Sequence, residues 1–212
     1  PTAADHLGAW VVDRAVRGVG PLCGAAQLVH GYRADRNYPH DEARLEALCR
    51  REVGKSFTAG FVTGLAGMLT LPVGLCSNLG TLWILQARLA AAIATLRGHD
   101  LRDAWVRSLV FSCLLGSAAP DVLRRSGVQL AQWVTRRAVL QLGDAGLGSL
   151  NRRIGVRLLA TGGGRGALSL TRLVPVAGAA VGGLFDAATA RATARCAKGL
   201  FAPPRLLSAR QA

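Results

Sequence analysis

The hydrophobic positions of this chain repeat with the period of an α-helix along most of its length. Leu7, Trp10 and Val11 recur at helical spacing and predict a first amphipathic helix over 5–17. Runs that alternate β-branched or aromatic residues with polar ones, the usual strand pattern, are scarce. Ala and Leu, strong helix formers, supply much of the apolar content. The pattern therefore predicts an all-α fold, a compact multi-helix bundle with Gly-rich apolar central helices.

Glycine, proline and acidic residues predict where the later helices begin and end. Asp41 is expected to be the N-cap of one helix, Gly98 the C′ residue of another, and Asp100 the cap of a third, with Asp103 three residues on. The predicted helices cover 22–30, 41–55, 73–97, 100–116, 121–142, 151–160 and 175–201, and the predicted loops cover 31–40, 143–151 and 161–166.

The polar stretch 31–40 marks the expected division of the chain. We predict an N-terminal helical arm over 1–42, a main helical domain over 43–202 and a flexible tail over 203–212, after two consecutive prolines. Because the first residue is Pro1, we expect the natural N-terminus to be processed or to lie upstream.

The segment from Ser56 to Ala87 contains no charged residue, and Pro72 divides it into arms 57–71 and 73–87. Each arm reaches about 22 Å as a helix, short of the roughly 30 Å of a bilayer core. Three interpretations follow: a buried helical core, a hairpin that enters one leaflet, or a membrane span. Basic residues lie on both sides of the segment: Arg50, Arg51, Lys55, Arg88 and Arg97. They place both ends on the cytoplasmic side, which favours a hairpin over a single crossing.

The net charge of +14 is concentrated in the second half of the chain. Residues 1–103 have 11 basic and 9 acidic side chains, whereas residues 104–212 have 15 basic and 3 acidic ones. Such an excess attracts polyanions, either anionic lipid or nucleic acid, although a solvated face is the simpler interpretation. The residues predicted to contact lipid or another anion are Arg124, Arg125, Arg136, Arg137, Arg152, Arg153 and Arg157.

Three ordered motifs give the chain a resemblance to a known family. They are built on Gly60, Gly64, Gly67 and Pro72, then on Gly98 and Asp100, and last on Pro175, Gly178, Gly182 and Asp186. In this order and over about residues 43–202, the sequence resembles the EcsC protein family. The resemblance gives these residues structural roles and implies no catalytic ones. It implies a bacterial protein at or near the cytoplasmic membrane, in a family whose molecular function is not established.

The sequence contains no recognisable catalytic or metal-binding motif. Its five cysteines are irregularly spaced without a CxxC pair, which fits a reducing, cytoplasmic environment. Ser77 does not lie in a GxSxG motif, and Asp100 beside His99 is expected to act as a helix cap rather than in an acid–base pair. Asp186 is expected to pair with Arg191 or another arginine, and the alternative is a functional carboxylate within the membrane. We therefore propose no cofactor and no metal.

These observations favour a non-catalytic, membrane-associated protein, peripheral or shallowly inserted at the inner membrane on its cytoplasmic side. Its expected partners are an anionic membrane surface and a membrane protein such as a transporter. Nucleic-acid binding is the first alternative, and it lacks a recognised motif or stacking aromatics among the basic residues. A hydrolase with an unrecognised site near His99, Asp100 or Ser77 is the second.

Overall fold

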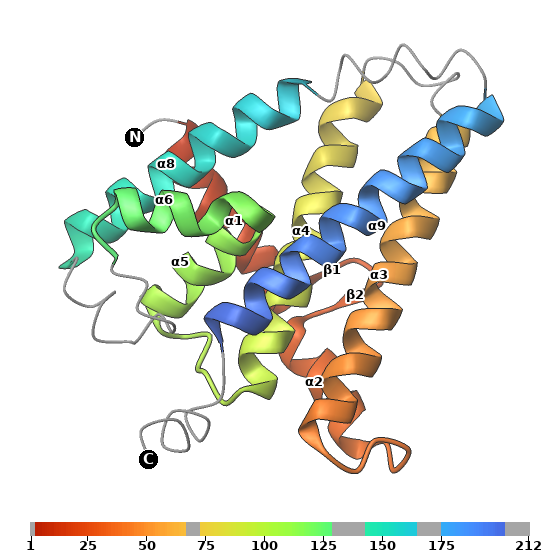
Figure 1. Ribbon diagram of the computed structural model, residues 1–212, viewed down its shortest axis with the longest axis horizontal. Coiled ribbons are helices and arrows are strands. Elements are labelled where there is room, and N and C mark those ends of the chain that lie inside the picture. Colours follow the sequence, from red (N-terminus) through yellow and green to blue (C-terminus); the bar gives the residue numbers. More distant parts are fainter. Residues whose placement is uncertain (1–2, 67–72, 129–142, 165–174, 202–212) are drawn as a thin grey trace.

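The computed structural model describes residues 3–66, 73–128, 143–164 and 175–201, and these form a helical bundle (Figure 1). The all-α prediction is confirmed for this part of the chain. Its elements are α1 (Ala3–Arg17), β1 (Gly18–Val19), β2 (Leu22–Cys23), α2 (Ala25–Ala34), α3 (Asp41–Ala66), α4 (Val73–Leu96), α5 (Ala104–Cys113), the 3-10 turn η1 (Gly116–Ala118), α6 (Ala119–Arg125), α8 (Gly143–Gly164) and α9 (Pro175–Leu200).

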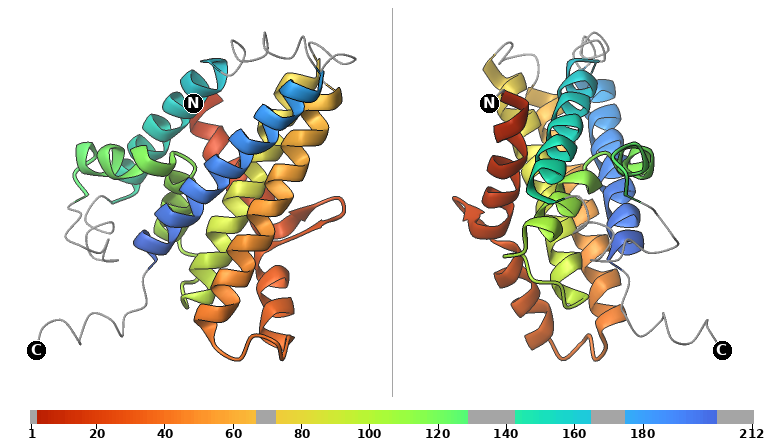
Figure 2. Two further views of the ribbon diagram at one scale, coloured as in Figure 1. Left: turned by 45° about the vertical axis from the view of Figure 1, so that its right-hand side comes forward. Right: turned by 90° about the vertical axis from the view of Figure 1, so that its left-hand side faces the viewer.

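Helix α4 is the centre of the bundle and contacts α1, α2, α3, α5 and α9. Its second half, from Leu82 to Leu96, is buried almost without interruption, and Ile93 is fully enclosed. The end of the uncharged segment, residues 82–87, therefore packs inside the protein. On one side of α4 lie α3 and α9, which run antiparallel to each other; α1, α5, α6 and α8 form a second group (Figure 2).

The N-terminal helices share the main hydrophobic core. Val11 and Ala15 of α1 and Val29 of α2 belong to the same buried cluster as Ile93 of α4 and Leu109 of α5. Burial of these side chains removes roughly 1.5–3 kcal/mol of unfavourable hydration for each large aliphatic one. The segment predicted as an arm is thus part of the packed bundle.

Two helices end with the same glycine-dependent hydrogen-bond pattern. At the end of α4, Gly98 has φ +82°, its N–H bonds to Thr95 O at 3.1 Å, and His99 N–H bonds to Ala94 O at 3.0 Å. At the end of α6, Gly127 has φ +84° and the pattern repeats. This is the Schellman motif. It confirms the predicted end at Gly98, and it makes the predicted single helix over 121–142 wrong.

Several other predicted boundaries are wrong. The segment 18–23 forms a two-stranded hairpin, with Gly20 at φ +54° in its turn, before α2 starts at Ala25. Helix α2 continues to Ala34, so Tyr32 is a buried helical residue, not a loop residue. Helix α8 begins at Gly143 within the expected 143–151 loop and runs to Gly164, into the expected loop 161–166. The predicted tail over 203–212 lies outside the described residues.

Two acidic caps differ from their predicted positions. Asp41 is the first residue of α3, and this helix continues past Lys55 to Ala66. Helix α5 begins at Ala104 with Asp103 as its N-cap, so Asp100 does not cap it. Instead, Asp100 Oδ1 accepts the backbone N–H of Arg102 at 2.9 Å in a local turn.

Polar side chains tie α4 to both of its long neighbours. Arg88 of α4, 2% exposed, pairs with Glu52 of α3, 3% exposed, and also donates to Cys23 O at 3.3 Å. On the other side, Gln86 Nε2 donates to Thr189 Oγ1 of α9 at 2.9 Å. The sequence predicts that Arg88 marks a cytoplasmic end of the uncharged segment, but its guanidinium lies inside the bundle.

Candidate functional site

Helices α6 and α8 place five of the seven predicted arginines on one exposed surface, here called the α6–α8 basic face. Its members are Arg124, Arg125, Arg152, Arg153 and Arg157. Arg153 Nη1 donates to the backbone oxygen of Arg125 at 2.7 Å, so the end of α6 lies directly against α8. Arg136 and Arg137 lie outside the described residues. The acids of these helices, Asp121 and Asp144, lie in the first turns, where the helix dipole favours them.

Exposed aliphatic side chains lie among these arginines. Val156 is 55% exposed and Leu159 45% exposed, whereas Ile154 and Leu158 on the opposite side of α8 are buried in the core. At 100° per residue, the exposed side of α8 alternates arginine with Val or Leu. A helix surface of this kind matches the boundary between lipid headgroups and acyl chains.

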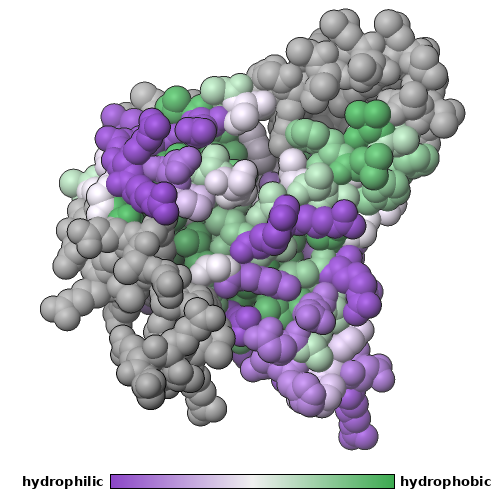
Figure 3. Space-filling model, viewed as in Figure 1, coloured by the Kyte–Doolittle hydropathy of each residue, from purple (hydrophilic) through white to green (hydrophobic). Residues whose placement is uncertain are grey.

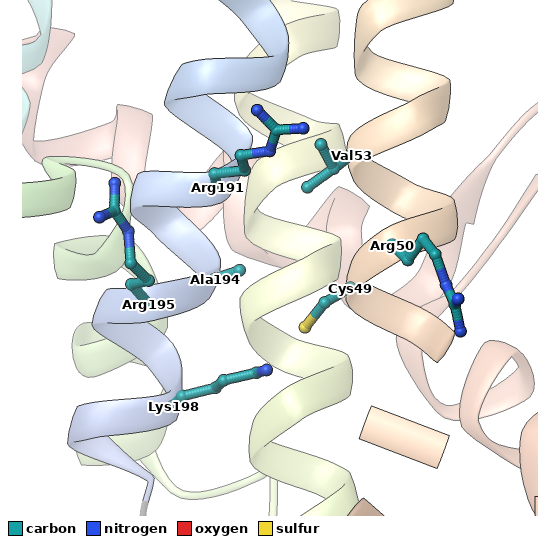
Figure 4. A pocket seen from close by; sticks show the side chains of 7 residues that line it. All are labelled: Cys49, Arg50, Val53, Arg191, Ala194, Arg195 and Lys198. Atoms are coloured by element: carbon teal, nitrogen blue, oxygen red, sulfur yellow. The ribbon is translucent and has the colours of Figure 1, made fainter. Parts of the chain in front are cut away.

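A second basic surface lies between α3 and α9, and we call it the α3–α9 groove. It has a volume of about 530 Å³ and is lined by Cys49, Arg50, Val53, Arg191, Ala194, Arg195 and Lys198 (Figure 4). Lys198 and the Cys49 thiol point into the gap between the helices, whereas Arg50 and Arg195 lie at its two flanks. No Asp or Glu among the described residues lies within 4.0 Å of its four cations.

The groove residues were outside the predicted site. Arg191, Arg195 and Lys198 recur at i, i+4 and i+7 in the sequence, which places them on one stripe of α9. That spacing was a usable signal for half of the groove. Arg50 and Cys49 come from α3, about 140 residues earlier, and only the antiparallel packing of the two helices brings them opposite this stripe.

The glycines of the resemblance motifs bring α3 and α9 into close contact. A Cβ atom on Gly60 would lie 2.6 Å from Gly182 O and 2.6 Å from Asp186 Oδ2. A Cβ on Gly183 would lie 3.0 Å from the backbone oxygen of Phe57. Close packing of this kind requires glycine at 60 and 183, so the structural role expected of Gly60 agrees with the geometry, and Gly182 takes part through its backbone oxygen.

The other motif residues have separate local positions. Gly64 and Gly178 lie within α3 and α9, and Pro175 is the first residue of α9. Gly67 and Pro72 lie outside the described residues. Asp186 faces Gly60 on α3 and Arg191 lines the groove, and the expected ion pair of Asp186 with Arg191 or another arginine stays a prediction.

His99 and Asp100 do not form an acid–base pair. The imidazole packs against Trp105 and Phe201, with ring centroids 5.6 and 5.2 Å away, and its buried Nε2 has no hydrogen-bond partner among the described residues. Burial lowers the pKa of His99 because a charged imidazolium loses its hydration there. Ser77 lies within α4. The hydrolase alternative therefore gains no catalytic geometry from this pair.

Four cysteines, Cys23, Cys49, Cys113 and Cys196, are free thiols. Cys113 of α5 and Cys196 of α9 interact, and burial raises the pKa of Cys113 while the hydrogen bond lowers that of Cys196. In the part of the chain that the structure describes, no group of three or more His, Cys, Asp or Glu side chains is arranged to hold a metal ion.

Comparison of the chain with family models, curated proteins and solved structures gives no match. The resemblance to the EcsC family therefore stays a prediction. Within the ranges that the structure describes, none of the helices combines the length and hydropathy needed to cross a bilayer.

Proposed function

We propose that the protein is a non-catalytic, membrane-associated protein of the EcsC-like type, which uses the α6–α8 basic face to contact anionic lipid. The observation that supports this most is the interleaving of exposed arginines with Val156 and Leu159 on α8. The proposed location is the cytoplasmic side of the inner membrane, with peripheral or shallow attachment. A membrane protein such as a transporter is a possible further partner.

Two physical terms support attachment at this face. Each well-placed cation near an anionic surface contributes about 1 kcal/mol at physiological ionic strength. The two aliphatic side chains add a hydrophobic term when they enter the acyl boundary, and this term is insensitive to salt. Attachment should therefore weaken with increasing ionic strength without disappearing.

The test is sedimentation with liposomes of anionic or neutral lipid at low and high salt. The variant is Arg124→Glu with Arg157→Glu, which leaves Arg153 and its hydrogen bond to α6 intact. The matched control is Arg36→Glu with Arg102→Glu, two exposed arginines outside α6 and α8 that change the net charge by the same amount. We expect the face variant to bind anionic liposomes at least about 30-fold more weakly, because two contributions of about 1 kcal/mol each are lost.

Equal binding by the face variant and its control would contradict the proposal, since net charge alone would then explain attachment. Binding of the wild type to neutral and anionic lipid alike would contradict the electrostatic part. A salt-sensitive gel shift with DNA, combined with no liposome binding, would favour the nucleic-acid alternative instead.

A further inference from the structure

The α3–α9 groove has properties that the α6–α8 basic face does not explain. It belongs to different helices, it is concave, and its four cations come from two chain segments that meet only in the fold. Its volume of about 530 Å³ falls within the range of small-molecule sites in proteins. A merely solvated basic face would need neither the hollow nor the two cations, Arg191 and Lys198, that point into it.

Its cationic end suits a phosphate group. Arg50, Arg191, Arg195 and Lys198 surround the hollow, and Lys198 reaches into it while only half-exposed (Figure 4). Arginine and lysine donors form charge-assisted hydrogen bonds with phosphate oxygens, and several cations around one site favour a group with more than one negative charge. Burial raises the pKa of Cys49 in the groove, and the charge of Glu46, which also reaches the groove, adds to this rise against the opposite effect of Lys198.

The same stripe of α9 is apolar towards its N-terminal end. Leu184 lies seven residues, or about 10 Å, before Arg191 on the same side of the helix and is 63% exposed. Across the seam, Phe57 of α3 lies one turn beyond Val53 and is 38% exposed. Figure 3 shows hydrophobic surface over the N-terminal part of α9 next to hydrophilic surface over the region of the groove.

We propose that the α3–α9 groove binds an amphiphile with a terminal phosphate monoester, which carries more than one negative charge and no attached choline. Its phosphate lies between Arg191 and Lys198, with Arg50 and Arg195 at the flanks of the groove. Its apolar chain extends along the seam towards Phe57 and Leu184. The floor of Val53 and Ala194 between the cations is apolar and contacts the part of the ligand next to the phosphate. The phosphate could come from a monomeric amphiphile or from a lipid in a bilayer, and the experiment distinguishes these sources.

Cys49 provides a reporter within the groove itself. Its thiol lines the hollow and faces Lys198 (Figure 4), so a bound ligand should shield it from alkylation. The full-length protein is treated with iodoacetamide, and modification of the Cys49 peptide is followed by mass spectrometry with and without a probe. The probes are dioctanoyl phosphatidic acid below its micellar concentration, dioctanoyl phosphatidylcholine, inorganic phosphate, and vesicles of neutral lipid with or without phosphatidic acid. Isothermal titration measures the affinity of each soluble probe.

We expect monomeric dioctanoyl phosphatidic acid to protect Cys49 and phosphatidylcholine not to. Arg191→Ala with Arg195→Ala should weaken the affinity at least about tenfold, because each lost charge-assisted bond to phosphate weakens binding by roughly that factor. Leu184→Ser should weaken the binding of dioctanoyl phosphatidic acid severalfold and leave the affinity for inorganic phosphate unchanged. Arg36→Ala with Arg102→Ala is the matched control and should change nothing.

Other results have defined meanings. Protection by vesicles that contain phosphatidic acid, but not by the monomer, supports the proposed chemistry with the bilayer as the source. Equal protection by inorganic phosphate and by the amphiphile overturns the apolar half of the proposal. Absence of protection by every probe, or affinity unchanged in the arginine variant, overturns the site. The α6–α8 basic face is intact in all these variants, so the outcome is independent of the proposed membrane contact.

Discussion

Helices α3 and α9 meet in two different ways along one seam. Near Gly60, Gly182 and Gly183 the two backbones are in direct contact, with no room for a further Cβ atom. Near Cys49 and Lys198 the same helices stand apart around a cation-lined hollow. At this open end each helix is attached to α4 instead, through polar side chains.

The difference indicates that contacts with α4, and not contacts between α3 and α9, fix the two helices at the groove. Two of the four lining cations, Arg191 and Lys198, point into the hollow and repel one another, so they contribute nothing to closing it. Arg88 and Gln86 of α4 hold α3 and α9 in place at this end, while glycines fix their distance at the other. Each of these supports can be removed separately, which gives a series of predictions in order of decreasing effect.

The largest effect is expected from Arg88→Met, which removes the support of α3 at the open end. Glu52, 3% exposed, would keep only its ion pair with Lys55, which is 42% exposed, and loss of its buried partner should cost up to about 3–5 kcal/mol. Urea unfolding followed by circular dichroism measures the loss. Glu52→Leu combined with Arg88→Met should recover much of it, whereas Arg102→Met at an exposed position should change stability by less than about 0.5 kcal/mol. A double variant with a lower free energy of unfolding than Arg88→Met alone would contradict this account.

The next effect is expected at the closed end, from Gly60→Ala. The new methyl group would meet two oxygen atoms at 2.6 Å, one of them in the backbone, and overpacking of this kind costs about 1–3 kcal/mol. Gly54→Ala in the same helix is the matched control, since a Cβ there meets nothing within 4 Å. It should stabilise the protein by about 0.5–1 kcal/mol through helix propensity. Similar changes in both variants would mean that the glycine contact is not tight.

A smaller, pH-dependent effect is expected where α9 ends against the start of α5. Burial lowers the pKa of His99, so the unfolded chain takes up a proton more readily than the folded one. The stability that depends on the neutral imidazole is present above the unfolded pKa of about 6.5 and is lost as the pH falls towards the lower folded value. His99→Phe should reduce the loss of unfolding free energy between about pH 7.5 and 5.5. Identical slopes for wild type and variant would contradict the assignment.

The smallest effect concerns the Cys49 thiol inside the groove. Its pKa is raised by burial, and the positive charge of Lys198 opposes that rise. Lys198→Met should raise the pKa further and slow alkylation of Cys49 by less than about fivefold, because such charge pairs contribute at most about 1 kcal/mol. Peptide mass spectrometry over a pH series measures the rate. Faster alkylation in this variant would show that Lys198 acts mainly by covering the thiol.

The sequence predicts the helical class and several helix limits because these depend on local chemistry. The glycine at 98 and the start of α9 at Pro175 follow from backbone preferences alone. Local signals also mislead: the glycines of 143–148 suggest a loop, yet Leu147 and Leu150 are buried and hold that segment in α8. Tertiary packing outweighs the weak propensity there.

The candidate sites divide in the same way. The α6–α8 basic face was predictable because its arginines are close in sequence and face solvent. The α3–α9 groove was not, because Arg50 and Lys198 are brought together only by the fold. The role of Arg88 was misjudged for a related reason. A charge that ends an apolar run looks like a surface residue until its distant partner, Glu52, is known.

The Glu52–Arg88 pair also restricts how this fold can diverge. A substitution at either position alone leaves a buried charge, whereas replacement of both by apolar side chains keeps the interior filled and neutral. In any lineage with this architecture, the two positions should therefore vary together and pass rarely through single-site intermediates. Covariation between them would identify distant members whose overall sequences have little else in common.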